Sequence, residues 1–484
     1  MVDFDYAAAL SDNIATLILL LLALVAGWVV FTLNKPPAKD APVKVPIGII
    51  ESMNRLVASE APWWHLQLRE SLGSSIFQHN IPAPGGMYVI CSAKDQREVL
   101  LDTTSDKPLH LYSSFDSIVG HKHIFTRSTT DPLLKEAKKS IVHAFSSSEI
   151  KRMNAICTKC IKEWEADFLE KIADTDATFD PSIELPKVVF KSIVEAAFEY
   201  EATPEDFELF TSNFDIAVRE IAFRQAVNPL RKLFSFMIPK VWEARKCCSV
   251  MQNFAKKVLE AYRNNPNKSE CNTLIKIVET KLNHFSEQHK TAELLSLIVA
   301  GFDSTGYTLA NTLVLLAKHP EEMKRLQQSL LQDDPAQSND HLKRVITESQ
   351  RVIPVGAMGS VRLINRDFIL FDELSNRKVK VPKGAAVFLP QITSHRDEMV
   401  FKDAEQFKPD RWENPTKEMV QSFIPFAVGK RTCPGQSLAN AELFSVLSSI
   451  LSKYEFELVT EGTLEVFMTM KYANTKLRAK RVKA

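Results

Sequence analysis

Glycine and net charge are both scarce in this chain of 484 residues. Only 14 residues are glycine, and no two of them fall in a G-x-G-x-x-G or a G-x-x-x-x-G-K-S/T pattern, so neither common nucleotide-binding loop is encoded. The 60 lysines and arginines balance 59 acidic residues, which leaves a net charge of +1. Binding to a phosphate backbone depends on a basic surface, so this balance argues against nucleic acid as a partner.

Cysteine is sparse as well, with seven copies. An odd, low count in a long chain argues against a disulfide framework and indicates a reducing compartment. Cys157 and Cys160 form a C-x-x-C pair, but no second pair or histidine pair stands at zinc spacing. We therefore assign that pair no metal or redox role.

The composition is that of a globular protein, with 45% hydrophobic and 25% charged residues. One hydrophobic run stands out, because residues 14–33 read IATLILLLLALVAGWVVFTL without a charge. Twenty such residues span a bilayer core of about 30 Å. Acidic residues precede the run and no A-x-A site closes it, which disfavours a cleaved signal peptide. Three lysines follow it and place the rest of the chain in the cytosol: Lys35, Lys39 and Lys44.

These features predict four segments. Residues 1–13 form a short lumenal tail and residues 14–33 a transmembrane anchor. A proline-rich linker over 34–47 then leads to one body over 48–484.

The periodicity of the body predicts a mainly α protein with a small β part. Expected helices lie near 133–145, 148–173, 187–199, 204–226, 239–264, 287–318, 337–353 and 436–453. Expected strands lie near 88–90, 387–389, 455–459 and 464–470.

The strongest motif is Phe426-Ala-Val-Gly429-Lys-Arg431-Thr-Cys433-Pro-Gly435, which stands directly before a helix-like run. The two glycines allow the backbone to curl around Cys433. Amide donors and the positive end of the following helix then favour a thiolate at its sulfur. A shielded, amide-bonded thiolate is what an iron ligand requires.

This loop resembles the F-x-x-G-x-R-x-C-x-G loop of the cytochrome P-450 heme-thiolate monooxygenases, in their membrane-anchored eukaryotic microsomal form. The resemblance implies a heme b cofactor (iron protoporphyrin IX) with Cys433 as axial ligand of the iron. It implies that Arg431 binds a heme propionate and that Phe426 packs against the loop. It also implies the family's fold, in which a long helix crosses the heme and the cysteine loop precedes a C-terminal helix.

A second resemblance concerns three charged residues. Glu348-Ser-Gln-Arg351 and the segment Phe407 to Trp412, which contains Arg411, resemble the family's E-x-x-R and P-E-R-F elements. They imply a structural triad in which Glu348 is buried between Arg351 and Arg411. Removal of one member would leave a buried charge uncompensated, at a cost of about 3–5 kcal/mol.

The apolar stretch from Leu294 to Ala317 contains two interior glycines, Gly301 and Gly306. Each costs about 1 kcal/mol against alanine in a helix, so we expect a kink or a close ligand approach there. Four residues at helical spacing share one face: Leu297, Ala300, Gly301 and Ser304.

Residues 300–305 resemble the family's oxygen-activating A-G-x-D-T-T/S. The resemblance implies that Ala300 and Gly301 lie against the heme. It implies catalytic roles for Asp303, Ser304 and Thr305, in which the acid and the alcohol relay protons. Ser304 takes the place of the usual threonine.

Two further cations complete the predicted heme site. The segment 131–146 resembles the family's W-x-x-x-R helix, with Leu134 in place of tryptophan and Lys138 in place of arginine. Lys138 would pair with a propionate as a point charge. Arg362 matches another propionate arginine. His395-Arg396-Asp397 is familial too, and we assign it a structural role.

The sequence thus indicates a monooxygenase that inserts one oxygen atom from O2 into a lipophilic substrate such as a sterol, fatty acid or terpenoid. Electrons would come from an NADPH-dependent flavoprotein reductase, with cytochrome b5 as a further partner, because the chain encodes no nucleotide loop of its own. A basic face including Lys430 is the candidate docking surface. The resemblance makes the endoplasmic reticulum the expected membrane.

Two alternatives stay open. One is a heme-thiolate isomerase or dehydratase that acts on lipid hydroperoxides, and retention of Asp303 and Ser304 argues against it. The other is a noncatalytic heme-binding membrane sensor, which the departures at Leu134 and Lys138 keep open.

Overall fold

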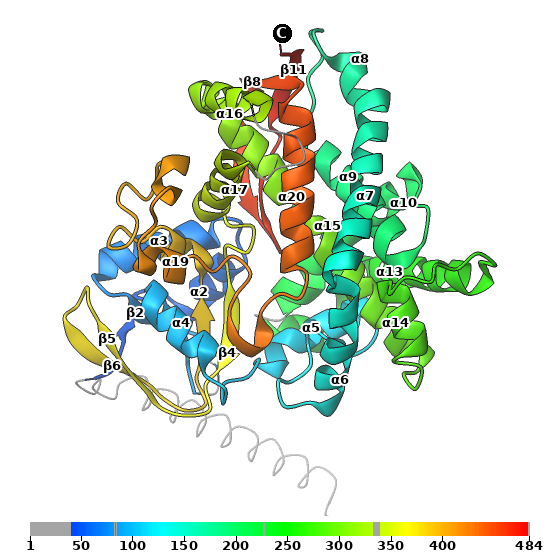
Figure 1. Cartoon of the computed structure of the whole chain (residues 1–484). Helices are drawn as coiled ribbons and strands as arrows, with labels where there is room; N and C mark the ends of the chain where they lie inside the picture. Colours follow the sequence, from blue (N-terminus) through cyan, green and yellow to red (C-terminus); the bar gives the residue numbers. More distant parts are fainter. Residues whose placement is uncertain (1–39, 82, 84, 226–227, 333–338, 483–484) are drawn as a thin grey trace, which may run out of the picture.

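The computed structural model describes residues 40–81, 83, 85–225, 228–332 and 339–482. Helices make up most of it and surround the long helix α15 (Figure 1). The helices are α2 (Ile49–Leu56), α3 (Ala61–Leu72), α4 (Ala93–Leu101), α5 (Leu109–Val119), α6 (Pro132–Ile141), α7 (Ser147–Trp164), α8 (Glu170–Ile172), α9 (Pro181–Phe198), α10 (Pro204–Ala217), α12 (Pro229–Leu233), α13 (Pro239–Asn264), α14 (Leu274–Thr280), α15 (Glu287–Lys318), α16 (Pro320–Gln332), α17 (Asp340–Val352), α18 (Gln391–His395), α19 (Lys417–Ser422) and α20 (Gln436–Leu451).

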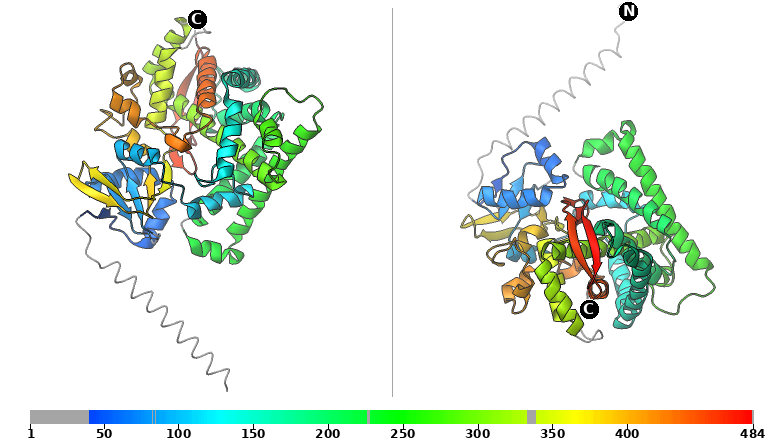
Figure 2. Two further views of the ribbon diagram at one scale, coloured as in Figure 1. Left: turned by 60° about the horizontal axis from the view of Figure 1, so that its bottom comes forward. Right: turned by 90° about the horizontal axis from the view of Figure 1, so that it is seen from above.

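The β part is small and gathers mainly on one side of the helices (Figures 1 and 2). One sheet has the order β1-β2-β3-β7-β4, and the remaining strands form the two-stranded pairs β5–β6, β9–β10 and β8–β11. Their bounds are β1 (Val43–Lys44), β2 (Ile76–His79), β3 (Met87–Ile90), β4 (Ser360–Leu363), β5 (Phe368–Asp372), β6 (Arg377–Val381), β7 (Ala386–Leu389), β8 (Tyr454–Thr460), β9 (Thr463–Val466), β10 (Met470–Ala473) and β11 (Lys476–Arg481).

The predicted fold class, mainly α with a small β part, is confirmed. The helices expected over 239–264 and 287–318 have those bounds as α13 and α15. The predicted strands are present as β3, β7, β8 and the β9–β10 hairpin. Helices α2 to α5 were not predicted.

Side-chain caps explain several helix starts. Ser286 accepts a hydrogen bond from the His289 amide at the start of α15. Thr203 and Asp206 form a reciprocal capping box at the start of α10. Such caps satisfy amide groups that have no partner inside the helix, so the long helices begin at defined residues.

Helix α15 is almost wholly buried and runs without interruption from Glu287 to Lys318. The helix is therefore not broken at either glycine. A Cβ atom on Gly301 would lie 2.8 Å from Ile193 Cγ1, and one on Gly306 would lie 2.8 Å from the Cα of Pro186. Both neighbours belong to α9, so the two glycines allow α9 and α15 to pack closely.

The predicted anchor at 14–33, the tail before it and the start of the linker lie outside the described residues. Within the described part of the chain, no helix has the length and apolar character needed to cross a membrane. Residues 43–44, which we expected in the linker, form β1 and pair with β2. Val45 is buried beside them, so the folded body includes residues before 48.

Candidate functional site

The cysteine loop lies between α19 and α20 and closes on itself. The Cys433 amide donates to the Phe426 carbonyl (3.0 Å), and Phe426 is half-buried. Gly429 has a φ of 79°, and a Cβ there would lie 2.7 Å from the Leu100 carbonyl oxygen, so only glycine fits. Gly435 has no such restriction and adopts a φ of −85° directly before α20.

Cys433 is solvent-accessible in the protein chain, whereas the other cysteines except Cys271 are buried. Protein packs around its thiol, and this partial burial raises the pKa of Cys433. The backbone amides of Gly435 and Gln436 and the charge of Lys138 act on the pKa in the opposite direction. The predicted amide donors are thus present, but they do not by themselves outweigh burial.

Four cations converge beside the loop: Lys107, Lys138, Arg362 and Arg431. Burial first, and then the charges of Arg431, Arg362 and Lys138, lower the pKa of Lys107 well below its usual value, while the nearby Asp106 carboxylate acts in the opposite direction. Burial and the neighbouring Arg362 lower the pKa of Arg431 to about 10.

These cations are held by neutral acceptors. Arg431 donates to the carbonyls of Ile124 (3.1 Å) and Arg127 and to the Thr129 hydroxyl (3.2 Å). Lys138 Nζ donates to the Lys430 carbonyl (2.6 Å), and Arg362 to the Val361 carbonyl (3.1 Å). Within the described residues, none of the four makes an ion pair with a carboxylate. The cluster therefore has the charge to hold an anionic ligand.

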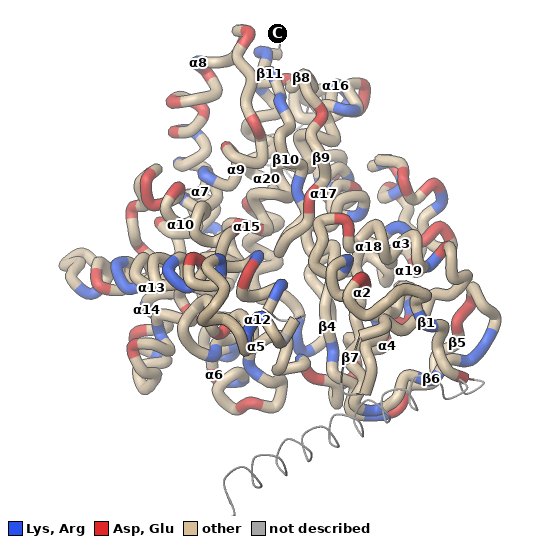
Figure 3. Tube along the Cα trace, turned by 180° about the vertical axis from the view of Figure 1, so that it is seen from behind, with Lys and Arg blue, Asp and Glu red and all other residues tan. Residues whose placement is uncertain are grey.

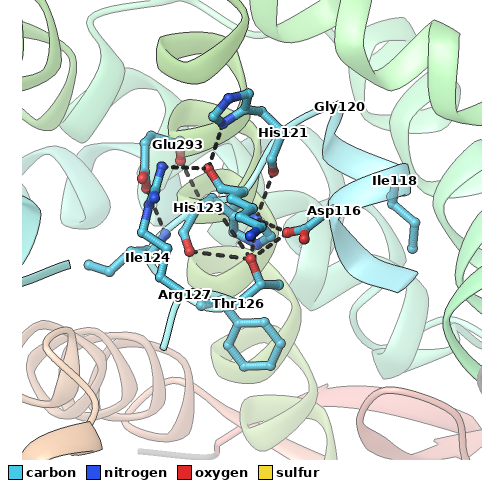
Figure 4. A network of polar contacts seen from close by, with 12 residues as sticks. Asp116, Ile118, Gly120, His121, His123, Ile124, Thr126, Arg127 and Glu293 are labelled. Carbon is cyan, nitrogen blue, oxygen red and sulfur yellow. Dashed lines mark hydrogen bonds and ion pairs between the residues drawn. The ribbon is translucent and has the colours of Figure 1, made fainter. Parts of the chain in front are cut away.

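The loop between α5 and α6, which supplies three of these acceptors, is itself fixed to α15 (Figure 4). The Ile124 amide donates to the buried Glu293 carboxylate (3.1 Å), and Arg127 Nη2 lies 2.9 Å from His289 Nε2. The Thr126 hydroxyl donates to Asp116 on α5. Arg431 is thus positioned by a rigid polar network.

The predicted oxygen-activating residues lie on α15. Ala300 is exposed and Ser304 is half-buried, although the helix around them is buried. The Ser304 hydroxyl donates back to the Ala300 carbonyl (3.0 Å). Thr305 is buried. An open side at Ala300 and Ser304 leaves room for a ligand along this part of the helix.

Asp303 has a different partner from Ser304. Its carboxylate accepts a hydrogen bond from the Thr469 hydroxyl (2.7 Å), in the turn between β9 and β10. Burial raises the pKa of Asp303 to about 6, against the opposing effects of Thr469 and Lys471. The structure therefore does not join the acid and the alcohol directly.

The predicted triad is fully assembled. Glu348 accepts from Arg351 (2.8 and 2.9 Å) and from Arg411 (2.9 Å), and both Glu348 and Arg351 are completely buried. The Lys408 amide and the Trp412 indole N–H also donate to this carboxylate. The cluster ties α17 to the segment before α19.

Three residues of these sites escaped the sequence reasoning: Lys107, Trp412 and Thr469. Lys107 and Thr469 belong to no motif and reach the site from distant segments. Trp412 stands directly beside Arg411 in the predicted triad, so its position in the sequence could have identified it as a further donor.

The fold and the site define a mainly helical protein with the accessible thiol of Cys433 beside four cations, two of them buried, that form no ion pair with a carboxylate in the described part of the chain. Comparison with known proteins supplies the family. The family model for cytochrome P-450 matches residues 71–480. The chain belongs to the cytochrome P-450 family.

Individual relatives of the chain are also cytochrome P-450 proteins. The chain is 35% identical over 186 residues to a putative cytochrome P-450 of Caenorhabditis elegans, a match that covers 36% of this chain and 35% of that protein. It is 24% identical over 357 residues to a probable cytochrome P-450 of Dictyostelium discoideum, covering 68% of this chain and 70% of the relative. A cytochrome P-450 monooxygenase of Macrophomina phaseolina is 30% identical over 183 residues, covering 34% and 43%. The first match thus spans about a third of that relative's length.

Family membership confirms the predicted cytochrome P-450 family and its heme cofactor. The residues fit the group. A heme carries two propionate carboxylates, which would supply the counter-charge that the four cations lack. Cys433 offers a thiol that the chain leaves accessible, and Ala300 offers an open side on α15.

Proposed function

We propose that this protein is a heme-thiolate monooxygenase that inserts one oxygen atom from O2 into a lipophilic substrate. The observation that carries the proposal is a cluster of four cations beside the accessible thiol of Cys433. Lys107 and Arg362 are buried, Lys138 and Arg431 are half-buried, and none of the four forms an ion pair with a carboxylate among the described residues. Such a cluster is costly unless an anionic cofactor completes it. When bound, the heme supplies the chemistry of oxygen activation.

The chain's own residues would perform three tasks. Cys433 holds the iron, and Lys107, Lys138, Arg362 and Arg431 bind the propionates. Asp303, with a pKa raised to about 6, can hold or release a proton near neutral pH. Ser304 can pass a proton only after its hydroxyl leaves the Ala300 carbonyl, because that bond now occupies its proton.

Electrons would come from an NADPH-dependent flavoprotein reductase, with cytochrome b5 as a second donor. Lys430 is exposed, and the Lys138 bond to its carbonyl places it beside the cysteine loop. Exposed lysines on α6 add to this basic face: Lys135 and Lys139. An acidic surface on the reductase would be complementary to it.

We also propose that the protein is a single-pass membrane protein of the endoplasmic reticulum with a cytosolic body. A run of exposed apolar side chains around α12 supports a second contact with the bilayer. Its members are Leu230, Leu233, Phe234, Phe236, Met237 and Trp242, each 46% or more exposed. If the full chain partitions into the aqueous phase rather than with vesicles, this location is wrong.

The decisive test is the absorption spectrum of the reduced, carbon-monoxide-bound full chain in detergent. We expect a red-shifted Soret band in the parent and its loss in Cys433→Ser. Cys271→Ser is the matched control, because Cys271 lies outside the loop, and it should keep the band. Absence of the band from heme-loaded parent would overturn the assignment of Cys433.

Turnover separates the proposal from its main alternative. We expect the protein with reductase and NADPH to incorporate one atom of labelled O2 into a member of a lipid panel. Conversion of a lipid hydroperoxide without NADPH, together with no incorporation, would instead identify an isomerase or dehydratase.

A further inference from the structure

A hollow of about 520 Å³ lies between α3 and the β9–β10 hairpin. Its walls come from α2, α3, the last residue of α15 and the β strands near the C-terminus. It is lined by Arg55, Glu60, Trp63, Trp64, Gln67, Lys318, Glu461, Gly462, Leu464 and Tyr472. Its volume is in the range of small-molecule sites.

This hollow is separate from the heme site. Lys318 stands 14 residues after Ser304 on the continuous helix α15, so the two lie about 21 Å apart along the helix axis. No residue of the cysteine loop or of the cation cluster lines the hollow. Figure 3 shows α2, α3, β9 and β10 on one side of the molecule.

The charged residues of the hollow balance each other. Arg55 and Lys318 supply two positive charges, and Glu60 and Glu461 supply two negative charges. The carboxylates disfavour a simple anion, and the cations disfavour a simple cation. All four charged residues are exposed, and contact with them also disfavours a purely apolar ligand. A dipolar ligand, with both signs of charge, is complementary to this lining.

The ion pairs that these charged residues already form do not prevent them from binding a ligand. Lys318 pairs with Glu461 (2.5 Å), and Arg55 pairs with Glu51 (3.1 Å) outside the hollow. The Arg55 and Glu51 side chains are each 50% exposed, and exposed pairs of this kind add little stability. An incoming ligand can therefore replace them at low cost.

The aromatic walls point to the kind of cation. Arg55 lies 5.7 Å from the centre of the Trp64 ring, and Lys318 lies 5.8 Å from the centre of the Tyr472 ring. The ring faces thus already attract cations. A quaternary ammonium needs no hydrogen-bond acceptor and binds to such faces.

We propose that this hollow binds a phosphocholine group. Arg55 and Lys318 would hold the phosphate, while Glu60, Glu461 and the half-buried Trp63 ring would hold the trimethylammonium. The group could be the headgroup of a membrane lipid or a free water-soluble phosphodiester, and the same chemistry recognises both.

Isothermal titration of the heme-loaded full chain in a phosphate-free, non-zwitterionic detergent tests this site. The probes are glycerophosphocholine, choline, glycerol 3-phosphate and dihexanoylphosphatidylcholine below its micelle concentration. We expect saturable binding of glycerophosphocholine, with choline and glycerol 3-phosphate at least tenfold weaker. The Soret band should stay unchanged on binding of glycerophosphocholine, because the heme site is not involved.

Variants assign the binding to the hollow. Trp63→Ala and Glu461→Gln should each weaken glycerophosphocholine binding about tenfold. Trp242→Ala is the matched control, since Trp242 is exposed and lies outside the hollow, and it should bind like the parent. Glu461→Gln removes only a half-exposed charge, so this variant can test the site even if Trp63→Ala does not fold.

Two results would overturn the proposal: no saturable binding of glycerophosphocholine, or equal affinity in Glu461→Gln, Trp242→Ala and the parent. Equal binding of glycerol 3-phosphate would also overturn it, because the site would then select an anion alone. Tighter binding of dihexanoylphosphatidylcholine supports a lipid headgroup as the source. Equal binding of the two phosphocholine probes supports a free phosphodiester.

Discussion

Two charge clusters of this protein are built in opposite ways. Around Glu348, one carboxylate receives Arg351 and Arg411, with an amide and an indole N–H as further donors. Beside Cys433, four cations donate to neutral acceptors, and burial together with neighbouring cations lowers the pKa values of Lys107 and Arg431. The first cluster is complete within the protein, whereas in the second the charge of one carboxylate, Asp106, opposes that of several cations.

The difference separates residues that hold the fold from residues that hold a ligand. A buried pair with every donor and acceptor used contributes to a single packed structure. A group of like charges destabilises the folded protein, so its presence indicates a binding site for a ligand of opposite charge. The comparison predicts opposite signs for equivalent substitutions in the two clusters.

The largest expected effect is at Glu348. Glu348→Gln removes the one negative charge between Arg351 and Arg411, which are buried, so the free energy of unfolding should fall by about 3–5 kcal/mol. Denaturant titration of parent and variant measures it. Glu413→Gln, which removes a half-exposed partner of Arg344, should change stability by less than about 1 kcal/mol. Equal losses in the two variants would contradict the comparison.

Another buried carboxyl, that of Glu442, sharpens the contrast. Among the described residues Glu442 pairs with no arginine, and its side chain accepts a hydrogen bond from the Ser192 hydroxyl (3.4 Å). Burial raises the pKa of Glu442 to about 8. The folded state thus binds this proton more tightly than the unfolded state, whose pKa is near 4.5. Glu442 therefore makes its full contribution to the free energy of unfolding below the unfolded pKa, and this contribution is lost as pH rises toward 8.

Glu442→Gln should remove this loss of stability at high pH. We expect the variant to gain a few kcal/mol over the parent at pH 8 and little at pH 5, since each unit of pKa difference is worth about 1.4 kcal/mol. Unfolding titrations at both pH values measure the difference. A gain that is the same at pH 5 and pH 8 would mean that Glu442 does not change its protonation between them.

How far the sequence predicted these features depends on where the partners lie. The helices α13 and α15 and the cysteine loop are local, and periodicity or spacing predicted them. The close contact of Gly301 with α9 could not be predicted, because its neighbour Ile193 lies more than a hundred residues earlier in the chain. Lys107 could not be found, since only the folded chain brings it beside Arg431.

A substitution at Lys107 in the cation cluster should therefore change stability in the opposite direction to Glu348→Gln. Lys107→Met removes a buried charge that its neighbours repel, so the heme-free protein should become more stable or stay unchanged. Heme affinity should fall about 10- to 100-fold, as for loss of a charged hydrogen bond worth about 1.5–3 kcal/mol. Thermal unfolding and heme titration measure the two effects. Lys94→Met, at an exposed site on α4, should alter neither.

The smallest expected effect concerns Asp303, a buried carboxylate whose side-chain partner is the Thr469 hydroxyl. Burial raises the pKa of Asp303 to about 6, and the Thr469 bond opposes that rise because it stabilises the charged form. Thr469→Val keeps the shape and removes the donor. The pKa of Asp303 should therefore increase further, by about one unit, which corresponds to about 1.4 kcal/mol.

Infrared titration of the protonated carboxyl band measures this pKa, and Asp303→Asn identifies the band by its loss. Thr308→Val is the matched control, because the Thr308 hydroxyl donates to the Ser304 carbonyl (2.7 Å) and not to Asp303. It should leave the midpoint near 6. A midpoint unchanged in Thr469→Val would show that burial alone sets the protonation of Asp303, and that the β9–β10 turn has no part in preparing this acid for proton transfer.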